Sequence, residues 1–389
     1  MRFVPDLGGA LPVVVLATLA AAILSFVLTP VATRIARRFD ILDHPDHRRV
    51  NTRPVPRGGG LAVAATFLAV AGAFLVANDR LGLVRGSGSV DPGELGALLA
   101  GGAAAALIGA LDDYLQLRAR WQLAGQVLLA LGAVALGISV GFVNNPFGPG
   151  SIRFDGLYAL AFTVVWIVGM INSINFIDGL DGLSSGIGLI AAATLGLISL
   201  TTTIGQPFVA VLCFALAGAL LGFLRWNFHP ATIFAGTSGV MFLGYTLALL
   251  AILGTAKVAV ALLVLGIPII DTFWIIVRRI GSGRSPFTPD RGHIHHRLLD
   301  LGLSHRQAVL LIYAMCVVLG VLTFALSGTG QVYAFFGIVI GSGLVLFVLT
   351  RRSLVAEELE AESYEEDAAA GVAAADADGR PRLDAGDGR

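Results

Sequence analysis

Charged residues are scarce in this chain of 389 residues: they make up 13% of it, about half the roughly 25% typical of soluble globular domains. The stretch from residue 182 to residue 224 contains no Asp, Glu, Lys or Arg. This shortage excludes an ordinary soluble enzyme, a disordered chain and a nucleic-acid-binding protein. It leaves a helical membrane protein, because the apolar runs are too long for the strands of a membrane barrel.

Cysteine and lysine are rare as well. The two cysteines, Cys213 and Cys316, both fall within apolar runs. We therefore interpret them as small buried side chains rather than as a disulfide or a metal site. Lys257 is the only lysine among 26 basic residues, and we assign it no function.

The net charge of zero conceals two regions of opposite charge. Residues 353–389 contain 11 acidic residues and 3 arginines, a net charge of −8, and the rest of the chain has a net charge of +8. The end of the chain is rich in Ala, Asp, Glu and Gly and has almost nothing to bury. We predict a transmembrane domain over residues 1–352 and a disordered acidic cytoplasmic tail over residues 353–389.

Eleven apolar segments predict an all-α polytopic membrane protein with about eleven transmembrane helices. With the N-terminus outside, the inside loops hold 18 basic residues and the outside loops hold 5, a clear positive-inside signal. The outside loop at residues 144–156 is rich in turn residues and predicts a small β-hairpin. The segments are residues 10–29, 58–77, 95–111, 123–143, 157–174, 183–203, 207–224, 239–254, 256–277, 308–326 and 331–350.

The carboxylates and histidines gather in the inside loops. Asp112 and Asp113 end the third segment, where adjacent carboxylates repel and are best stabilised by a cation or an arginine. They also fit a simple interfacial stop signal paired with Arg118 or Arg120. A transporter should instead place its ionisable groups near the middle of the membrane.

Residues 172–186, NSINFIDGLDGLSSG, carry a polar side chain at every third position: Asn172, Asn175, Asp178 and Asp181. Such residues are neighbours on a helix, which Gly179 and Gly182 could break. Amides can bind a nucleobase or a sugar, and carboxylates can hold Mg²⁺ together with substrate phosphates. The alternative is a polar seam between packed helices.

The longest inside loop contains His293, His295 and His296, flanked by Arg291 and Arg297. This concentration of donors suits a diphosphate. A zinc site and a merely solvated loop remain alternatives, and no cysteine lies nearby to complete a zinc ligand set.

Three further stretches carry candidate residues. The basic, proline-rich loop at residues 43–60 contains Arg57 and can attract anionic lipid headgroups, or it only determines topology. Asp271 lies within the ninth segment, as a functional group or as a structural partner of an inside arginine. The glycine-rich stretch at residues 236–239 could present backbone N–H groups to a phosphate or could be a helix-packing site.

Together, residues 172–186, residues 286–307 and the Asp112–Asp113 pair resemble the polyprenyl-phosphate N-acetylhexosamine-1-phosphate transferases of glycosyltransferase family 4. The resemblance covers residues 29–313. The pattern His-Ile-His-His-Arg from residue 293 resembles the bacterial branch that loads GlcNAc-1-phosphate, because the phospho-MurNAc-pentapeptide branch has three histidines followed by Glu. The chain departs from the family at Thr237, where the family usually has an Asp thought to bind Mg²⁺, and a hydroxyl is a weaker ligand than a carboxylate.

The resemblance implies transfer of HexNAc-1-phosphate from a UDP-sugar to polyprenyl phosphate at the cytoplasmic face of the bacterial plasma membrane, as the first membrane step of a cell-envelope glycan pathway. It implies Mg²⁺, with Mn²⁺ as an alternative, and a homodimer is an expected arrangement. A relative impaired by Thr237 that only binds substrates, and a transporter, are the competing hypotheses. The implied residues are Asp112, Asp113, Asp178 and Asp181 for catalysis; Asn172, Asn175, His293, His295, His296, Arg291 and Arg57 for substrate binding; and Asp113, Asp178 and Asp181 for metal binding, with Asp271 as a further member.

Overall fold

The computed structural model describes residues 7–44, 53–84, 90–145, 150–201, 204–254, 260–262, 265–281, 293–326 and 330–341. The chain divides into two units, Met1–Phe336 and Gly337–Arg389, and every site described below lies in the first. The acidic tail at residues 353–389 and its predicted boundary lie outside the described residues.

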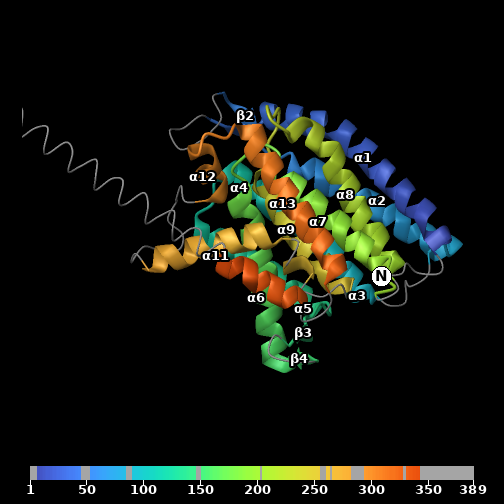
Figure 1. Ribbon diagram of the computed structural model, residues 1–389. Coiled ribbons are helices and arrows are strands. Elements are labelled where there is room, and N and C mark those ends of the chain that lie inside the picture. Colours follow the sequence, from blue (N-terminus) through green and yellow to red (C-terminus); the bar gives the residue numbers. More distant parts are fainter. Residues whose placement is uncertain are drawn as a thin grey trace, which may run out of the picture. The chain divides into compact units, whose positions relative to one another are not determined.

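Helices dominate the first unit (Figure 1). Helix α6 ends at Ile177 and α7 begins at Leu183, so the glycines of this stretch do break the helix, as the sequence suggested. Helix α13 begins with a capping box, in which Ser304 and Gln307 each accept a hydrogen bond from the other's backbone N–H. The helices are α1 (Leu7–Arg38), α2 (Gly60–Leu81), α3 (Pro92–Gly96), the π-helical turn η2 (Ala97–Gly101), α4 (Gly102–Leu115), α5 (Ala119–Ala135), α6 (Gly156–Ile177), α7 (Leu183–Ser199), α8 (Pro207–Asn227), α9 (Gly236–Leu253), α11 (Gly266–Gly281), α12 (Ile294–Asp300) and α13 (His305–Ala325).

Within the described residues, seven helices are long and apolar enough to cross a membrane, and three more are apolar but shorter. Each of the eleven predicted segments contains a helix or part of one, and the fourth segment runs past the end of α5 into a strand. A polytopic helical membrane protein is therefore confirmed. The number of spans and their orientation stay predictions.

Helix α9 lies at the centre of the packing, and 89% of its apolar window is buried. It packs against α4 and α6, while α1 packs along α8 and has only 22% of its window buried. An apolar helix that leaves most of its surface uncovered is suited to contact with lipid. The outer position of α1 and the central position of α9 are visible in Figure 1.

Two glycines allow helix backbones to approach the start of α9. A Cβ atom added to Gly60 would lie 1.9 Å from the Cα atom of Gly239, and one added to Gly109 would lie 2.5 Å from the Cα atom of Ser238. Helices α2 and α4 therefore contact the first turn of α9 through backbone atoms. This close packing fixes the position of the residues at the start of α9.

The described residues contain two short antiparallel strand pairs. Strands β1 (Leu42–Asp43) and β2 (Val55–Pro56) pair near the end of α1, and β3 (Phe142–Asn144) pairs with β4 (Ser151–Arg153). The second pair confirms the hairpin predicted from the turn residues. In Figure 1 this hairpin lies at one end of the helix bundle, whereas β2 and α12 lie at the other.

The contact between α2 and α9 yields a stability prediction. Gly60→Ala should lower the free energy of unfolding by about 1–3 kcal/mol or more, because the added methyl group meets backbone atoms that cannot rotate away. Gly72→Ala in the same helix is the matched control, since nothing lies within 4 Å of its added Cβ atom, and it should be neutral or stabilising. Thermal unfolding in detergent measures both, and equal midpoints for the two variants would contradict the packing described here.

Candidate functional site

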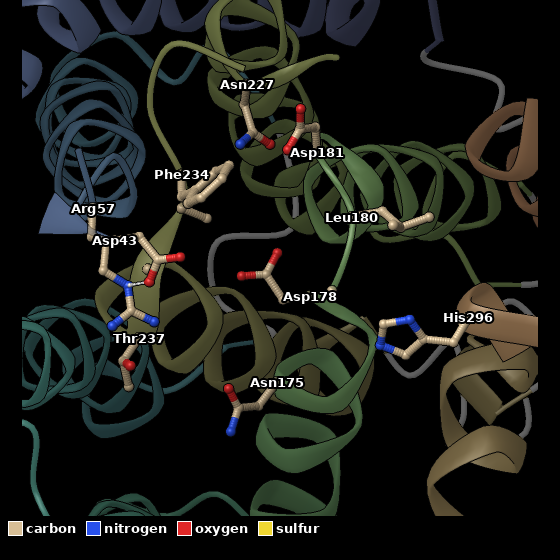
Figure 2. A pocket seen from close by; sticks show the side chains of 13 residues that line it. Asp43, Arg57, Asn175, Asp178, Leu180, Asp181, Asn227, Phe234, Thr237 and His296 are labelled. Atoms are coloured by element: carbon tan, nitrogen blue, oxygen red, sulfur yellow. Dashed lines mark ion pairs between the residues drawn. The ribbon is translucent and has the colours of Figure 1, made fainter. Parts of the chain in front are cut away.

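Two adjoining cavities open among the loops at the end of the bundle that carries α12. The first has a volume of about 260 Å³ and the second about 340 Å³. Asn175, Asp178, Gly179 and His296 line both cavities and thus form a shared wall. Figure 2 shows the Asp178 carboxylate near the centre of the first cavity, between Asn175, Asp181 and the Asp43–Arg57 pair.

Asp178 follows the last residue of α6 and begins the turn that leads to α7. Gly182 closes this turn with φ +79°, a conformation that favours glycine. The carboxylate accepts a hydrogen bond from the hydroxyl of Ser184. Burial raises the pKa of Asp178 to about 7; the nearby Asp113 and Asp181 also raise it, and Ser184 and Arg57 lower it. Burial therefore disfavours the charged form of this carboxyl group, and a cation beside it would stabilise that form.

The amides of α6 extend this wall. Asn172 donates through Nδ2 to Gln126 Oε1 at 2.6 Å and to the Val168 carbonyl at 2.8 Å, and it lines the second cavity. Asn175 lines both cavities. The predicted helical stripe therefore holds for the two asparagines, whereas Asp178 and Asp181 lie in the turn beyond the helix.

Asp181 lies on the far side of this turn and lines the first cavity. Its Oδ2 atom is 2.7 Å from Nδ1 of His229 and accepts a hydrogen bond from the backbone N–H of Ala231 at 3.0 Å. The turn after α6 is thereby joined to the segment after α8. His229 was not among the residues predicted from sequence.

The two adjacent acids of α4 face different partners, and neither lines the two cavities. Asp113 accepts hydrogen bonds from the backbone N–H groups of Thr237 at 2.8 Å and Ser238 at 3.0 Å. Asp112 accepts, on a single oxygen, from the backbone N–H of Leu117 and from Gln122 Nε2. Asp113 thus caps the N-terminus of α9, where it meets the positive end of the helix dipole.

This cap bears on the interpretation of the glycine-rich stretch. Two N–H groups of this stretch, those of Thr237 and Ser238, donate to Asp113 rather than being directed at a phosphate. Gly236 has φ +72°, and a Cβ atom added to it would lie 2.6 Å from Asp113 Oδ2. These contacts agree with the alternative interpretation of the glycine-rich stretch, that it is a helix-packing site. Thr237 itself lines the first cavity, as Asn175 and Asp178 do.

The predicted histidines come together at the second cavity, which all three line. Asp271 holds His293 in place, since its Oδ2 is 2.8 Å from His293 Nδ1 and its Oδ1 accepts the N–H of Ile294. Burial, helped by His296 and His293, lowers the pKa of His295 to about 2, so its ring is neutral. Asp271 therefore pairs with a histidine, a partner that the sequence did not suggest. Arg291 lies outside the described residues.

Arg57 supplies positive charge to the first cavity. Its Nε atom is 3.1 Å from Oδ1 of Asp43, a buried residue on β1. The strand pair β1–β2 holds the two residues close together. Sequence reasoning overlooked Asp43, although it belongs to the same basic loop as Arg57.

Other lining residues were also overlooked. Asn227 lines the first cavity, and Gln126, Phe176 and Arg279 line the second. Asn227 accepts from Ser185 and donates to the carbonyl of Ile233. Phe176 lies between two predicted site residues in the sequence, which was a usable signal, whereas Gln126 reaches the site only through tertiary packing.

The donor set of the first cavity suits a hard cation. Asp178 offers a carboxylate, and Asn175 and Thr237 offer neutral oxygen atoms; Mg²⁺ binds in this way when substrate phosphates complete its shell. Two groups of three potential ligands occur among the described residues, Asp181–His229–His305 and Asp271–His293–His295. Asp113 and Asp178 belong to neither, so the predicted trio Asp113, Asp178 and Asp181 does not gather as one ligand set there.

The sequence of this chain is similar to those of a known protein family. The sequence profile described as glycosyl transferase family 4 matches residues 95–255. A probable undecaprenyl-phosphate N-acetylglucosaminyl 1-phosphate transferase of Bacillus subtilis is 34% identical over 77% of this chain and 81% of its own length. A decaprenyl-phosphate N-acetylglucosaminephosphotransferase of Mycolicibacterium smegmatis is 36% identical over 88% and 90%. An undecaprenyl-phosphate alpha-N-acetylglucosaminyl 1-phosphate transferase of Thermotoga maritima is 30% identical over 71% and 78%.

The two adjacent acids provide a matched pair of variants. In the native protein each oxygen of Asp113 accepts one backbone N–H group. Asp113→Asn replaces one of these oxygens by an NH₂ group, which leaves one N–H group without an acceptor. We therefore expect a loss of about 1–3 kcal/mol in unfolding free energy. Asp112→Asn keeps the one oxygen that accepts both of its hydrogen bonds and should cost less. Thermal unfolding in detergent compares them, and an equal or smaller loss for Asp113→Asn would overturn the capping role.

Proposed function

The chain belongs to glycosyl transferase family 4, and from that premise we propose that it transfers GlcNAc-1-phosphate from UDP-GlcNAc to polyprenyl phosphate, giving polyprenyl-diphosphate-GlcNAc and UMP. The names of the relatives support this sugar and this type of acceptor. They do not favour an impaired relative that only binds substrates. The apolar helices and the family together make the chain a multi-pass membrane enzyme.

The position of Asp178 in the wall shared by two cavities is the observation that carries the proposal. Two phosphorylated substrates must meet at one point, and each can approach this wall from its own side. An oxygen of the lipid phosphate attacks the β-phosphorus of the nucleotide sugar and forms a new P–O bond. The bond from the β-phosphorus to the oxygen bridging it to the α-phosphorus breaks, and that oxygen leaves with UMP.

The nucleophile needs little help from a base. The second pKa of a phosphate monoester is about 6, so the lipid phosphate is largely ionised near neutral pH. The greater obstacle is repulsion between two anions. Arg57 brings positive charge to the first cavity, and the histidines of the second can donate hydrogen bonds to a diphosphate.

We assign Mg²⁺, with Mn²⁺ as an alternative, to the oxygen donors around Asp178. When bound, such an ion neutralises phosphate charge and aligns the reacting groups. Asp178, Asn175 and Thr237 would hold it, and Asp181 lies across the same cavity. Asp113 supports this arrangement by holding the start of α9, which carries Thr237.

We place the active site at the cytoplasmic face of the bacterial plasma membrane, in an early step of a cell-envelope glycan pathway. The excess of basic residues in the loops that bear the site supports this orientation. A water-soluble nucleotide sugar and a lipid-anchored phosphate can meet only at a membrane surface. A homodimer stays a prediction.

Asp178→Asn tests the central assignment. Removing the negative charge should lower turnover by at least about 100-fold, since an interaction at the transferred group is typically worth this much. The assay is mass spectrometry of the lipid product and UMP release from UDP-GlcNAc and polyprenyl phosphate. Asp300→Asn, at the end of α12 and exposed, is the control, and a normal rate for Asp178→Asn would reject the placement.

Thr237→Asp tests the metal assignment. A second carboxylate in the wall of the first cavity should lower the Mg²⁺ concentration needed for half-maximal rate by about tenfold, because Mg²⁺ prefers anionic oxygen ligands. Thr237→Asn, of similar size but neutral, should not produce this change. Turnover that is absent in the unaltered protein and appears with Thr237→Asp would instead support the impaired relative. An unchanged Mg²⁺ requirement would place the ion elsewhere.

A further inference from the structure

One group of three potential metal ligands lies beside the proposed active site, and two of its members, His229 and His305, have no role in the reaction described above. It consists of Asp181, His229 and His305, whose nearest ligand atoms all lie within 4.8 Å of one another. The three residues come from the turn before α7, the segment after α8 and the first position of α13. All three are only partly buried, so an ion can reach them.

The environment of His305 indicates a missing partner. Both ring nitrogens are buried, and neither has a hydrogen-bond partner. The ring stacks on His229 with 4.1 Å between the centroids, and both the carboxylate and the backbone of Asp181 lie close enough to interact with it. Buried ring nitrogens normally have at least one well-formed hydrogen bond. A metal ion among these three side chains would satisfy one of these nitrogens.

The backbone around the group is well anchored. Arg306 donates through Nε to the His229 carbonyl at 3.2 Å, and the hydroxyl of Tyr313 donates to the Gly182 carbonyl. The N–H of Ala231 fixes Asp181 Oδ2 at 3.0 Å. The three ligands thus sit on segments that are already tied together, and binding would require mainly rotation of the imidazole rings.

We infer that Asp181, His229 and His305 form a binding site for a divalent transition-metal ion, with Zn²⁺ as the ion of choice. Two imidazoles and one carboxylate are a ligand set used for zinc, with a fourth position open to water. Zinc bonds of about 2.0–2.2 Å put tetrahedral ligand atoms about 3.4 Å apart. The ligand atoms here all lie within 4.8 Å of one another. His229 Nδ1 and Asp181 Oδ2 are 2.7 Å apart, in hydrogen-bond contact, so zinc binding would replace this contact and move the two atoms slightly apart.

This site differs in chemistry from the one around Asp178. Imidazole nitrogens favour Zn²⁺ and its neighbours in the transition series, whereas Mg²⁺ favours oxygen ligands and phosphates. The two sites therefore select different ions. Millimolar Mg²⁺ does not compete effectively for two imidazoles.

Zinc at this site would affect the transferase, and this part rests on the proposed function. Asp181 is a ligand of the group and also lines the first cavity; in Figure 2 its carboxylate lies beside Asn227 at the edge of that cavity. Zinc binding neutralises this carboxylate and fixes its position. Occupancy of the site therefore slows turnover.

Binding is measured first, without substrates, on the purified full-length protein in detergent. Co²⁺ serves as the probe because its absorption reports tetrahedral coordination, and Zn²⁺ is then added as a competitor in the presence of millimolar Mg²⁺. We expect one Co²⁺ per chain, displaced by Zn²⁺. His305→Gln and His229→Gln should each weaken Co²⁺ binding at least about tenfold. Mutating a residue that only orients a metal ligand already lowers metal affinity by about this factor, and removing the ligand itself should lower it at least as much.

Two controls make the result decisive. His44→Gln removes a histidine outside the group and should leave Co²⁺ binding unchanged. His293→Gln removes a member of the group with Asp271 and His295, and it too should leave binding unchanged. Binding that survives in His305→Gln, or that is lost with His293→Gln alone, overturns the inference. Thermal unfolding of each variant shows that it is folded.

Activity is a separate readout. Micromolar Zn²⁺ should reduce the rate of GlcNAc-1-phosphate transfer by the unaltered enzyme several-fold more than it reduces the residual rate of His305→Gln. Equal inhibition of the two proteins refutes the regulatory effect. If the transferase assignment itself fails, no lipid product forms in either protein, and the Co²⁺ spectra still decide whether the metal site exists.

Discussion

The hydrogen bonds from the first turn of α9 to Asp113 are the contact on which the site depends. They satisfy backbone N–H groups that the helix cannot satisfy itself, and they place a buried carboxylate against the positive end of a helix dipole. The same contact ties α4 to the most buried helix of the bundle. Because Thr237 belongs to this turn, the position of one cavity wall follows from a structural carboxylate.

The aspartates at this end of the helix bundle differ in how their negative charges are stabilised. Asp113, Asp181 and Asp271 each accept a backbone N–H, and the last two also face a histidine. Among the described residues, the hydrogen bond that Asp178 accepts comes from the Ser184 hydroxyl, and burial raises the pKa of Asp178. The carboxylate with the least compensation is the one between the two cavities. Burying such a carboxylate with few hydrogen-bond partners lowers the stability of the fold, and it leaves the oxygen atoms of the carboxylate available to a ligand.

Much of this could be predicted from the sequence, for reasons that are local. Apolar runs indicate helices, and the short spacing of the asparagines and aspartates from Asn172 to Asp181 indicates polar side chains that lie close together, as they do in lining the two cavities. The partnerships of Asp43 with Arg57, Asp181 with His229 and Asp271 with His293 could not be predicted, because each joins segments whose proximity is set by tertiary packing. The role of Gly236 was ambiguous for the same reason: only the fold shows that a carboxylate, and not a phosphate, meets the adjacent N–H groups.

The glycine contacts at the start of α9 also bear on biosynthesis. Gly60 on α2 and Gly109 on α4 both precede α9 in the chain, so a ribosome delivers these two helices to the membrane before α9 leaves its exit tunnel. The later helix can then dock against partners that are already inserted. The fit of α9 against these two helices would then fix its position, and the side of the first cavity that carries Thr237 would form late in the folding of the nascent protein.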